Sequence, residues 1–437
     1  MNRFGVTSKF ITLLIAAVCA TLFCGVFLGA GLGVAVLLNG MALLLTAIDF
    51  FAATGAKHFK AERILPNSFE QKVEALVELQ VYCNLPRRQK IRIADSPPKN
   101  FRFQESINGE AKETPATISY TVTPSQRGAF HFGNCYIEVV GPCGFSVKRL
   151  TLECPGEARV YPNLEPMRHY RLLASRKQLS RDDLSVHHIR GIGTDFAGLR
   201  EYTPDDDWRK INWKATARAA KLMTNVYDVE KNRDVIIAVD TGRWMQSPMG
   251  DVTRLDRALE LAAVLMQVAL SAGDRVGLAL FDTTVNYYLP PGKGVAQMRH
   301  FLQGLYGAHT QLVQSSLPAM SGALRQRLSK RAFICVLTYL DSPAEAAQAV
   351  ADLLPVSKRH SLFIASLTDL GLDALINTKA TEPQDLYLKA AAAYRKMAGL
   401  GAVETLVRNG IGACAAEPGE LLTRSVRYYL TVKQKPW

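Results

Sequence analysis

The sequence lacks the short motifs that mark several common enzyme classes. No GxxxxGK[ST] phosphate loop, HExxH zinc motif or GxSxG nucleophile turn occurs in its 437 residues. Their absence excludes the nucleotide hydrolases, metalloproteases and serine hydrolases that those motifs define. No CxxC pair occurs either, and no cysteine–histidine cluster has the spacing of metal ligands. The eight cysteines are therefore expected to be small buried side chains in a reducing compartment.

Charge is nearly absent from residues 10–53, where Asp49 is the single charged side chain. A helix spans the hydrocarbon core of a bilayer with roughly 20 apolar residues, so this run is long enough for two helices. Glycines at its middle favour a tight turn. The run predicts a transmembrane hairpin within residues 1–61, with spans at about residues 10–27 and 32–51. A signal peptide would have a shorter apolar core, and a helix pair buried in a soluble domain would carry more charge.

Basic residues flank the apolar run on both sides. Arg3 and Lys9 precede it, and Lys57, Lys60 and Arg63 follow it. Because cytoplasmic flanks carry the excess of lysine and arginine, both ends of the hairpin are expected in the cytoplasm. The sequence therefore predicts a two-pass protein of an inner (cytoplasmic) membrane, with lipid contacts through the hairpin and soluble domains in the cytoplasm.

The formal net charge of +13 favours anionic partners. For a membrane-anchored protein the simplest such partner is anionic lipid. Nucleic acid is not expected, because the positive excess is spread along the chain and aromatic residues are not interleaved with it. A lipid- or nucleic-acid-binding module is nevertheless one alternative function, and it predicts binding that weakens steeply with salt.

Two patterns divide the soluble part. Residues 62–165 hold short alternating segments such as Ala116–Thr123, with turn signals between them, which predicts a small antiparallel β-sandwich-like domain. From residue 234 to residue 437, buried-strand runs alternate with helical segments, which predicts a doubly wound parallel sheet, an α/β fold. Ligands of such sheets bind beyond the carboxyl ends of the strands. This rule places Asp240, Asp282 and Asp341 near one rim.

Residues 166–233 are rich in charge and hold no long apolar run. Pro204 and the aspartates Asp205–Asp207 predict a helix start, because carboxylates favour the positive end of the helix dipole. Arginines of this segment could bind an anionic ligand. The favoured interpretation is instead that they pair with Asp205–Asp207 and that the tryptophans pack on the next domain.

This segment carries the motifs of a known family. They read, in order, Gly193-Thr-Asp195-Phe196, Arg200-Glu-Tyr202, Asp205-Asp206, Arg209-Lys-Ile211-Asn-Trp213 and Ala217-Arg218. With them, the chain resembles the bacterial proteins that share domain of unknown function 58, whose pattern has Glu in place of Asp195 and Gly in place of Asp205. The resemblance implies membrane anchoring, a von Willebrand factor A-like domain, and association with AAA+ ATPases of the MoxR type.

Domains of that type often hold Mg²⁺ through an Asp-x-Ser-x-Ser motif, a loop threonine and a later aspartate. Mg²⁺ prefers about six oxygen ligands in octahedral geometry. Here the motif reads Asp240-Thr-Gly242-Arg-Trp244, so both serines are replaced. We therefore expect a degenerate metal site and no cofactor. If a metal ion is bound, its ligands would be Asp240, Thr310 and Asp341.

The sequence thus favours a non-enzymatic, membrane-anchored scaffold or adaptor that binds a cytoplasmic protein, with a MoxR-type AAA+ ATPase as the expected partner. The binding surface would be the α/β rim or the middle segment. The partner-binding residues predicted in that segment are Arg200, Tyr202, Asp206, Arg209, Trp213 and Arg218. The alternative is an enzyme with a nonstandard acidic site at Asp205–Asp207, although three consecutive carboxylates do not converge on one face.

Overall fold

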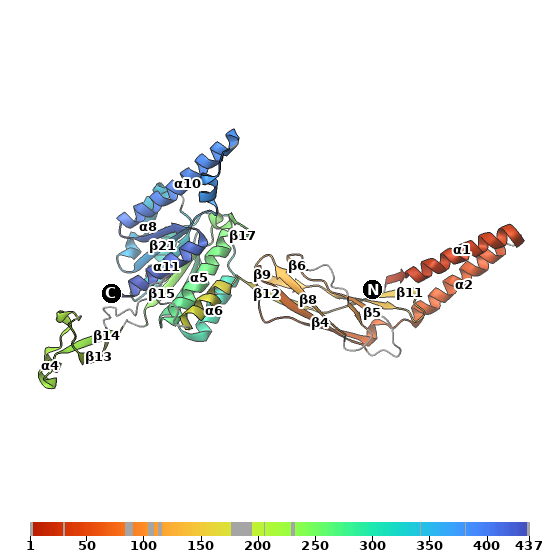
Figure 1. The fold of residues 1–437 in the computed structure, drawn as a ribbon, viewed down its shortest axis with the longest axis horizontal. Helices are drawn as coiled ribbons and strands as arrows, with labels where there is room; N and C mark the ends of the chain where they lie inside the picture. Colours follow the sequence, from red (N-terminus) through yellow and green to blue (C-terminus); the bar gives the residue numbers. More distant parts are fainter. Residues whose placement is uncertain are drawn as a thin grey trace. The chain divides into compact units, whose positions relative to one another are not determined.

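The computed structural model describes residues 3–28, 31–83, 91–103, 109–111, 116–175, 195–204, 206–228, 232–340, 342–380 and 382–434. The chain divides into two compact units, Met1–Tyr161 and Pro162–Trp437. The first holds antiparallel sheets and the second a mostly parallel one (Figure 1). The mixed α/β fold expected from the sequence is confirmed at this level.

Two apolar helices open the first unit, α1 (Ser8–Leu28) and α2 (Gly31–Ala52). By length and composition, the helical segment Val36–His58 could cross a membrane, and Ser8–Phe23 is a shorter apolar helical stretch among the described residues. The two helices run alongside each other (Figure 1). Most of their large apolar side chains are exposed, including Leu22, Val26, Leu37 and Phe51.

Three sheets complete the first unit, in the strand orders β1-β11-β10-β5-β7, β2-β4-β8-β6 and β3-β12-β9. Their strands are short and alternate buried with exposed positions, as the sequence pattern predicts for half-buried strands. The bounds are β1 Arg3–Val6, β2 Phe59–Ile64, β3 Phe69–Glu70, β4 Ala75–Cys83, β5 Ile91–Ala94, β6 Phe101–Phe103, β7 Gly109–Ala111, β8 Ala116–Pro124, β9 Gly128–Phe132, β10 Cys135–Val140, β11 Ser146–Leu152 and β12 Gly156–Tyr161. A 3-10 turn, η1 (Ala56–His58), joins α2 to β2.

Two features tie the apolar helices to these sheets. Strand β1, which precedes α1, pairs antiparallel with β11. Asp49, near the end of α2, is buried and accepts hydrogen bonds from the backbone of Cys143, Phe145 and Ser146. The one charge of the apolar run therefore anchors α2 to the turn between β10 and β11.

The second unit is built on a six-stranded sheet of order β19-β18-β15-β20-β21-β22, in which only the edge strand β19 is antiparallel. The strands are β15 Asp234–Asp240, β18 Arg275–Phe281, β19 Val285–Gly292, β20 Ala332–Thr338, β21 Ser361–Leu367 and β22 Gly412–Ala416. Strands β15 and β20 are buried throughout, as expected of parallel strands with helices on both faces.

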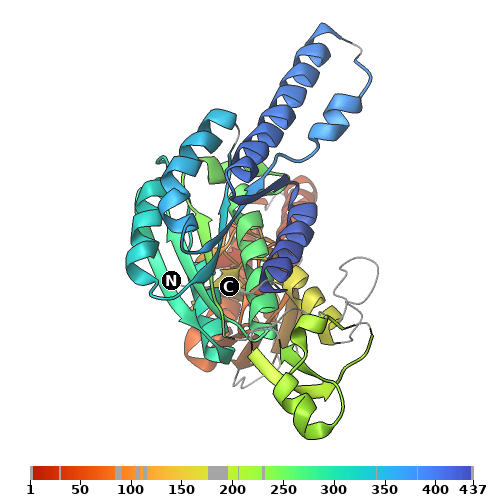
Figure 2. The same ribbon diagram turned by 90° about the vertical axis from the view of Figure 1, so that its left-hand side faces the viewer.

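Helices cover both faces of this sheet (Figure 2). One face packs against α5 (Arg254–Ser271), α6 (Gly294–Tyr306) and α11 (Pro418–Gln434), and the other against α7 (Leu317–Arg327), α8 (Pro343–Ser357) and α10 (Pro383–Arg408). The remaining elements are α3 Glu165–Ser175, η3 Arg243–Gln246, β16 Pro248–Met249, β17 Val252–Thr253 and α9 Leu372–Asn377. The arrangement leaves the two ends of the strands open for binding.

The middle segment forms a small substructure of its own. Strand β13 (Asp195–Glu201) pairs antiparallel with β14 (Met223–Asp228), and between them lie the 3-10 turn η2 (Trp208–Lys210) and the helix α4 (Trp213–Ala219). The helix start predicted at Asp205–Asp207 is found as the 3-10 turn η2, which Asp207 caps, and not as an α-helix. Asn212 caps the helix α4 by accepting from the Ala215 amide, because Ile211 is held in a β-bridge with Thr224.

Candidate functional site

The carboxyl end of β15 holds Asp240, which is only 5% exposed. One of its carboxylate oxygens accepts hydrogen bonds from the Gly242 amide (2.8 Å) and the Ser315 hydroxyl, and the other accepts from the Thr338 hydroxyl at 2.6 Å. Burial raises the pKa of Asp240 above its usual value, although the three hydrogen bonds act in the opposite direction. The carboxylate is thus engaged by the protein itself.

Around Asp240, the two serine positions of the metal motif supply no side-chain oxygen, and the hydroxyls that reach the carboxylate come from Ser315 and Thr338. A side chain at Gly242 would collide with the Ser315 hydroxyl and lie 3.0 Å from the Val313 carbonyl oxygen. Trp244 offers no oxygen, and Thr310 makes no hydrogen bond to Asp240 in the part of the chain that is described. Asp341 lies outside the described residues. Within the described ranges, no group of three or more His, Cys, Asp and Glu side chains could hold a metal ion.

Asp282, which follows β18, also accepts hydrogen bonds from residues of its own loop. Its carboxylate accepts from the Thr283 hydroxyl and the Thr284 amide, both at 3.2 Å, and from the Asn286 side chain. Asp282 lies near enough to Asp240 to contribute to its raised pKa. The predicted proximity of these two aspartates is therefore observed, but each one stabilises a turn.

Beside Asp240, the same edge of the sheet carries a buried arginine. Arg254, the first residue of α5, is 1% exposed. It donates to the Trp244 carbonyl oxygen at 2.7 Å and forms an ion pair with Asp369. Its guanidinium lies 3.8 Å from the centre of the Tyr339 ring, a cation–π distance. Arg254 Nε has no hydrogen-bond partner among the described residues.

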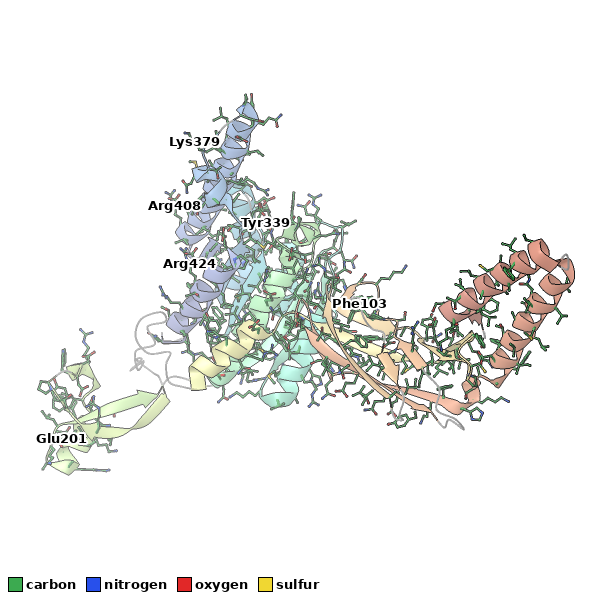
Figure 3. The ribbon with its side chains drawn as sticks, turned by 45° about the vertical axis from the view of Figure 1, so that its right-hand side comes forward. Phe103, Glu201, Tyr339, Lys379, Arg408 and Arg424 are labelled. Atoms are coloured by element: carbon green, nitrogen blue, oxygen red, sulfur yellow. The ribbon has the colours of Figure 1, made fainter. Side chains whose placement is uncertain are left out.

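Two more arginines surround this centre. Arg395 pairs with Asp369 at 3.1 Å and donates to the Tyr339 hydroxyl at 2.5 Å. Arg243 lies 5.1 Å from the Trp244 ring and has no ion pair within the described ranges. We call Arg243, Trp244, Arg254, Tyr339, Asp369 and Arg395 the arginine rim. Figure 3 labels Tyr339 within the α/β unit.

The arginine rim carries a positive excess, because it contains three guanidiniums and one carboxylate, that of Asp369, which pairs with Arg254 and Arg395. Trp244 is 41% exposed and the Arg395 side chain 45%, so the rim reaches solvent. Burial raises the pKa of Tyr339, so its hydroxyl stays protonated. An exposed tryptophan beside arginines is the composition that protein interfaces concentrate. The arrangement suits an acidic side chain of another protein.

Sequence reasoning missed most of this rim. Asp369 lies two residues beyond β21, so the strand-end rule that selected Asp240 could also have selected it. No sequence pattern indicates Arg254 and Arg395, because they belong to helices far apart in the chain and are brought together by the fold at Asp369 and Tyr339.

In the middle segment, the structure brings three of the six predicted partner-binding residues together. Arg200 forms an ion pair with Asp206, whose carboxylate also accepts from the Thr203 amide at 3.0 Å and hydroxyl at 2.9 Å. The Tyr202 hydroxyl donates to the Asp206 carbonyl oxygen at 3.3 Å. These contacts, the Thr203 amide first, lower the pKa of Asp206.

The other three predicted residues, Arg209, Trp213 and Arg218, are exposed. The expectation that the tryptophans pack on the next domain is wrong, since Trp208 is 67% and Trp213 68% exposed. Asp207 caps η2 by accepting from the Arg209 amide. Asp205 and Gly193 lie outside the described residues. Asp206 and Asp207 therefore hold local structure, whereas the two tryptophans, Arg209 and Arg218 are exposed.

Three comparisons place the chain among known proteins. Residues 198–372 match the family described as "Protein of unknown function DUF58". The uncharacterized protein YeaD of Bacillus subtilis (strain 168) is 23% identical over 194 residues, which cover 44% of this chain and 46% of that protein. The crystal structure of a CARDB domain of a Pyrococcus furiosus protein, in complex with di-metal ions, covers 25% of this chain and 90% of that one, at 15% identity and a TM-score of 0.17.

Proposed function

Because residues 198–372 of this chain form a DUF58 family domain, we propose that the protein is a membrane-anchored adaptor whose arginine rim binds an acidic surface of a cytoplasmic protein. The observation that carries the proposal is that the protein's own hydrogen bonds occupy the Asp240 carboxylate, while positively charged and aromatic side chains are exposed beside it. Asp240 is satisfied by Ser315, Thr338 and Gly242, and the exposed groups next to it are guanidiniums and an indole. Recognition there is by charge-assisted hydrogen bonds and cation–π contact rather than through a metal ion.

The anchor in this proposal is the helical hairpin of α1 and α2, crossing the bacterial inner membrane twice. Support comes from the exposed apolar side chains of both helices, such as Val26 at 78% and Phe51 at 82%, which water would disfavour. The basic flanks favour a cytoplasmic position for both ends. The soluble units then act on the cytoplasmic side.

The second unit belongs, in this proposal, to the von Willebrand factor A-like folds. Its doubly wound sheet with one antiparallel edge strand supports that assignment. The proposed role is non-enzymatic, because the titratable groups at the rim and in the middle segment are committed to ion pairs and caps. The partner class we propose is a AAA+ ATPase of the MoxR type, which the family resemblance implies.

Site-specific photo-cross-linking tests where the partner sits. A photoreactive phenylalanine analogue placed at Trp244, Trp208 or Trp213 replaces an exposed ring in each case. We expect irradiation of cells to give a high-molecular-mass adduct from position 244. Tyr136, 48% exposed in the first unit, is the matched control and is expected to give none.

An adduct from positions 208 and 213 but not from 244 would move the contact to the middle segment and contradict the rim as the docking surface. The absence of an adduct from all three positions, with the protein expressed and in the membrane fraction, would contradict the adaptor function itself.

A further inference from the structure

A polar pocket lies at the edge of the sheet where the parallel strands begin, opposite the edge that carries the arginine rim. It has a volume of about 420 Å³ and is lined by Gly322, Arg325, Gln326, Pro355, Arg359 and His360. The lining comes from the last turns of α7, the end of α8 and the residue just before β21. Its size falls within the range of small-ligand sites.

His360 is the chemically informative member of this pocket. It is 3% exposed, and its Nδ1 accepts a hydrogen bond from the Ala332 amide at 3.1 Å. A ring nitrogen that accepts carries no proton, so in the neutral imidazole the proton is on Nε2. Burial lowers the pKa of His360, and the nearby Arg359 and Arg331 act in the same direction. The ring is therefore neutral at physiological pH and presents an Nε2–H donor.

That donor has no partner among the described residues. A buried hydrogen-bond donor left unpaired costs about 1–3 kcal/mol, and native proteins hold few of them. Nε2 is closed to solvent in this arrangement of side chains, and an oxygen acceptor that reached it from the pocket, after a shift of its neighbours, would remove this cost. The acceptor that fits the surroundings is anionic, because Arg325 and Arg359 line the same space.

The guanidiniums of Arg325 and Arg359 have donors left to bind an anion in the pocket. Arg325 is exposed and makes no hydrogen bond or ion pair within the described ranges. Arg359 donates to the Ser329 carbonyl oxygen, which leaves other guanidinium donors free to turn inward. The carboxyl ends of α7 and α8 oppose an anion through their dipoles, and two full positive charges outweigh two partial negative ones.

From this cluster we propose that the pocket binds the phosphate group of a small organic phosphate, with His360 Nε2 and the guanidiniums of Arg325 and Arg359 as donors. Phosphate oxygens accept from arginine in paired geometry. The pocket is larger than the phosphate group, and Gly322 and Pro355 offer apolar wall to the rest of the molecule. This site is separate from the arginine rim and does not depend on the adaptor function.

Calorimetric titration of the full-length protein in detergent tests the proposal with two probes, glycerol 3-phosphate and inorganic phosphate, against glycerol as the uncharged control. We expect both phosphates to bind and glycerol to give no heat beyond dilution. Tighter binding of glycerol 3-phosphate indicates that the pocket holds an organic phosphate, and equal binding indicates that it reads the phosphate group alone.

Arg325→Gln should weaken binding at least tenfold, since a hydrogen bond to a charged group contributes about 1.5–3 kcal/mol. We expect the fold to be unaffected, because Arg325 is exposed and makes no hydrogen bond or ion pair within the described ranges. His360→Asn keeps an acceptor for the Ala332 amide but shortens the donor, and should also weaken binding. Arg408→Gln, on the exposed face of α10 (Figure 3), is the charge-matched control. No binding of either phosphate at millimolar concentration, or equal affinity in wild type and Arg325→Gln, would overturn the proposal.

Discussion

Replacing Asp95 by alanine is expected to lower the free energy of unfolding of the first unit by about 3–5 kcal/mol, the usual cost of removing one partner of a buried ion pair. The side chains of Arg63 and Asp95 are both 0% exposed. Two guanidinium nitrogens of Arg63 donate to the two Asp95 oxygens, and the Tyr120 hydroxyl donates to the same carboxylate.

Without Asp95, a buried guanidinium and a buried hydroxyl lose their acceptor together. Arg63 keeps its hydrogen bonds to the Cys154 and Gly133 carbonyl oxygens, but its charge is left uncompensated. Two further consequences of the network support its strength. Burial and the Asp95 carboxylate raise the pKa of Tyr120, and burial raises the pKa of Cys135 to about 12. These groups in the centre of the unit are therefore shielded from solvent.

Urea unfolding of the detergent-solubilised protein measures the effect. All four tryptophans lie after Tyr161, so their fluorescence follows the second unit, while hydrogen exchange at β4 and β8 follows the first. We expect Asp95→Ala to shift only the exchange. Glu138→Ala, which removes an exposed ion pair with Arg149, should cost less than about 1 kcal/mol. Similar costs for the two variants would contradict the buried network.

Replacing Asp49 by alanine is expected to release the end of α2 from the sheet that contains β10 and β11. Asp49 is 2% exposed. It accepts from the amides of Cys143 (2.7 Å), Phe145 (2.9 Å) and Ser146 (2.9 Å), and from the Ser146 hydroxyl at 2.9 Å. Each buried donor left without an acceptor costs about 1–3 kcal/mol, so the loss of four bonds outweighs any single contact at this junction.

The neighbouring sequence is adapted to this carboxylate. A side chain at Gly141 would collide with Asp49, so glycine is required there. Thr7 donates to the Gly144 carbonyl oxygen at 2.6 Å, and Lys148 donates to the Ala53 carbonyl oxygen at 3.3 Å. Strand β1, the end of α2 and the turn between β10 and β11 are thus held together by hydrogen bonds. The proposed anchor is therefore joined to the soluble unit without a flexible linker.

Hydrogen exchange at the amides of Cys143, Phe145 and Ser146 reports the junction directly. We expect these amides to exchange about tenfold faster or more in Asp49→Ala, because 1.4 kcal/mol corresponds to a factor of ten. Asp49→Asn keeps one acceptor oxygen and should give a smaller increase. Gly141→Ala should imitate Asp49→Ala through the collision. Unchanged exchange in Asp49→Ala would show that the carboxylate does not hold the turn.

The sequence predicted the features that depend on local pattern. The apolar runs of β15, β20 and β21 and the helical periodicity between them led to the mostly parallel sheet, and the strong alternation of β8 led to the antiparallel one. Features that depend on distant pairing were missed. Strand β1 has four residues and exists because β11 pairs with it. Strand β22 reads Gly-Ala-Cys-Ala-Ala and is too weakly apolar to recognise.

The same distinction holds for the candidate site. The loss of the two serine oxygens of the motif could be read from the sequence at Gly242 and Trp244. The replacement of those oxygens could not, because Ser315 and Thr338 are far from Asp240 in the chain and reach it only through the fold. The helix predicted to start at Asp205–Asp207 ends after the 3-10 turn η2 for a similar reason, since the bridge between Ile211 and Thr224 overrides local preference.

In the proposed function, the arginine rim binds a protein through its guanidiniums and without a metal ion. Affinity purification of the full-length protein in mild detergent, tagged after Trp437 and run with either Mg²⁺ or a chelator, tests it most directly. We predict stoichiometric recovery of one partner under both conditions, loss of it in Arg243→Glu, and no loss in the matched variant Arg408→Glu, whose side chain is exposed and lies outside the arginine rim and the middle segment. Recovery that requires Mg²⁺, or that survives Arg243→Glu unchanged, would contradict the account.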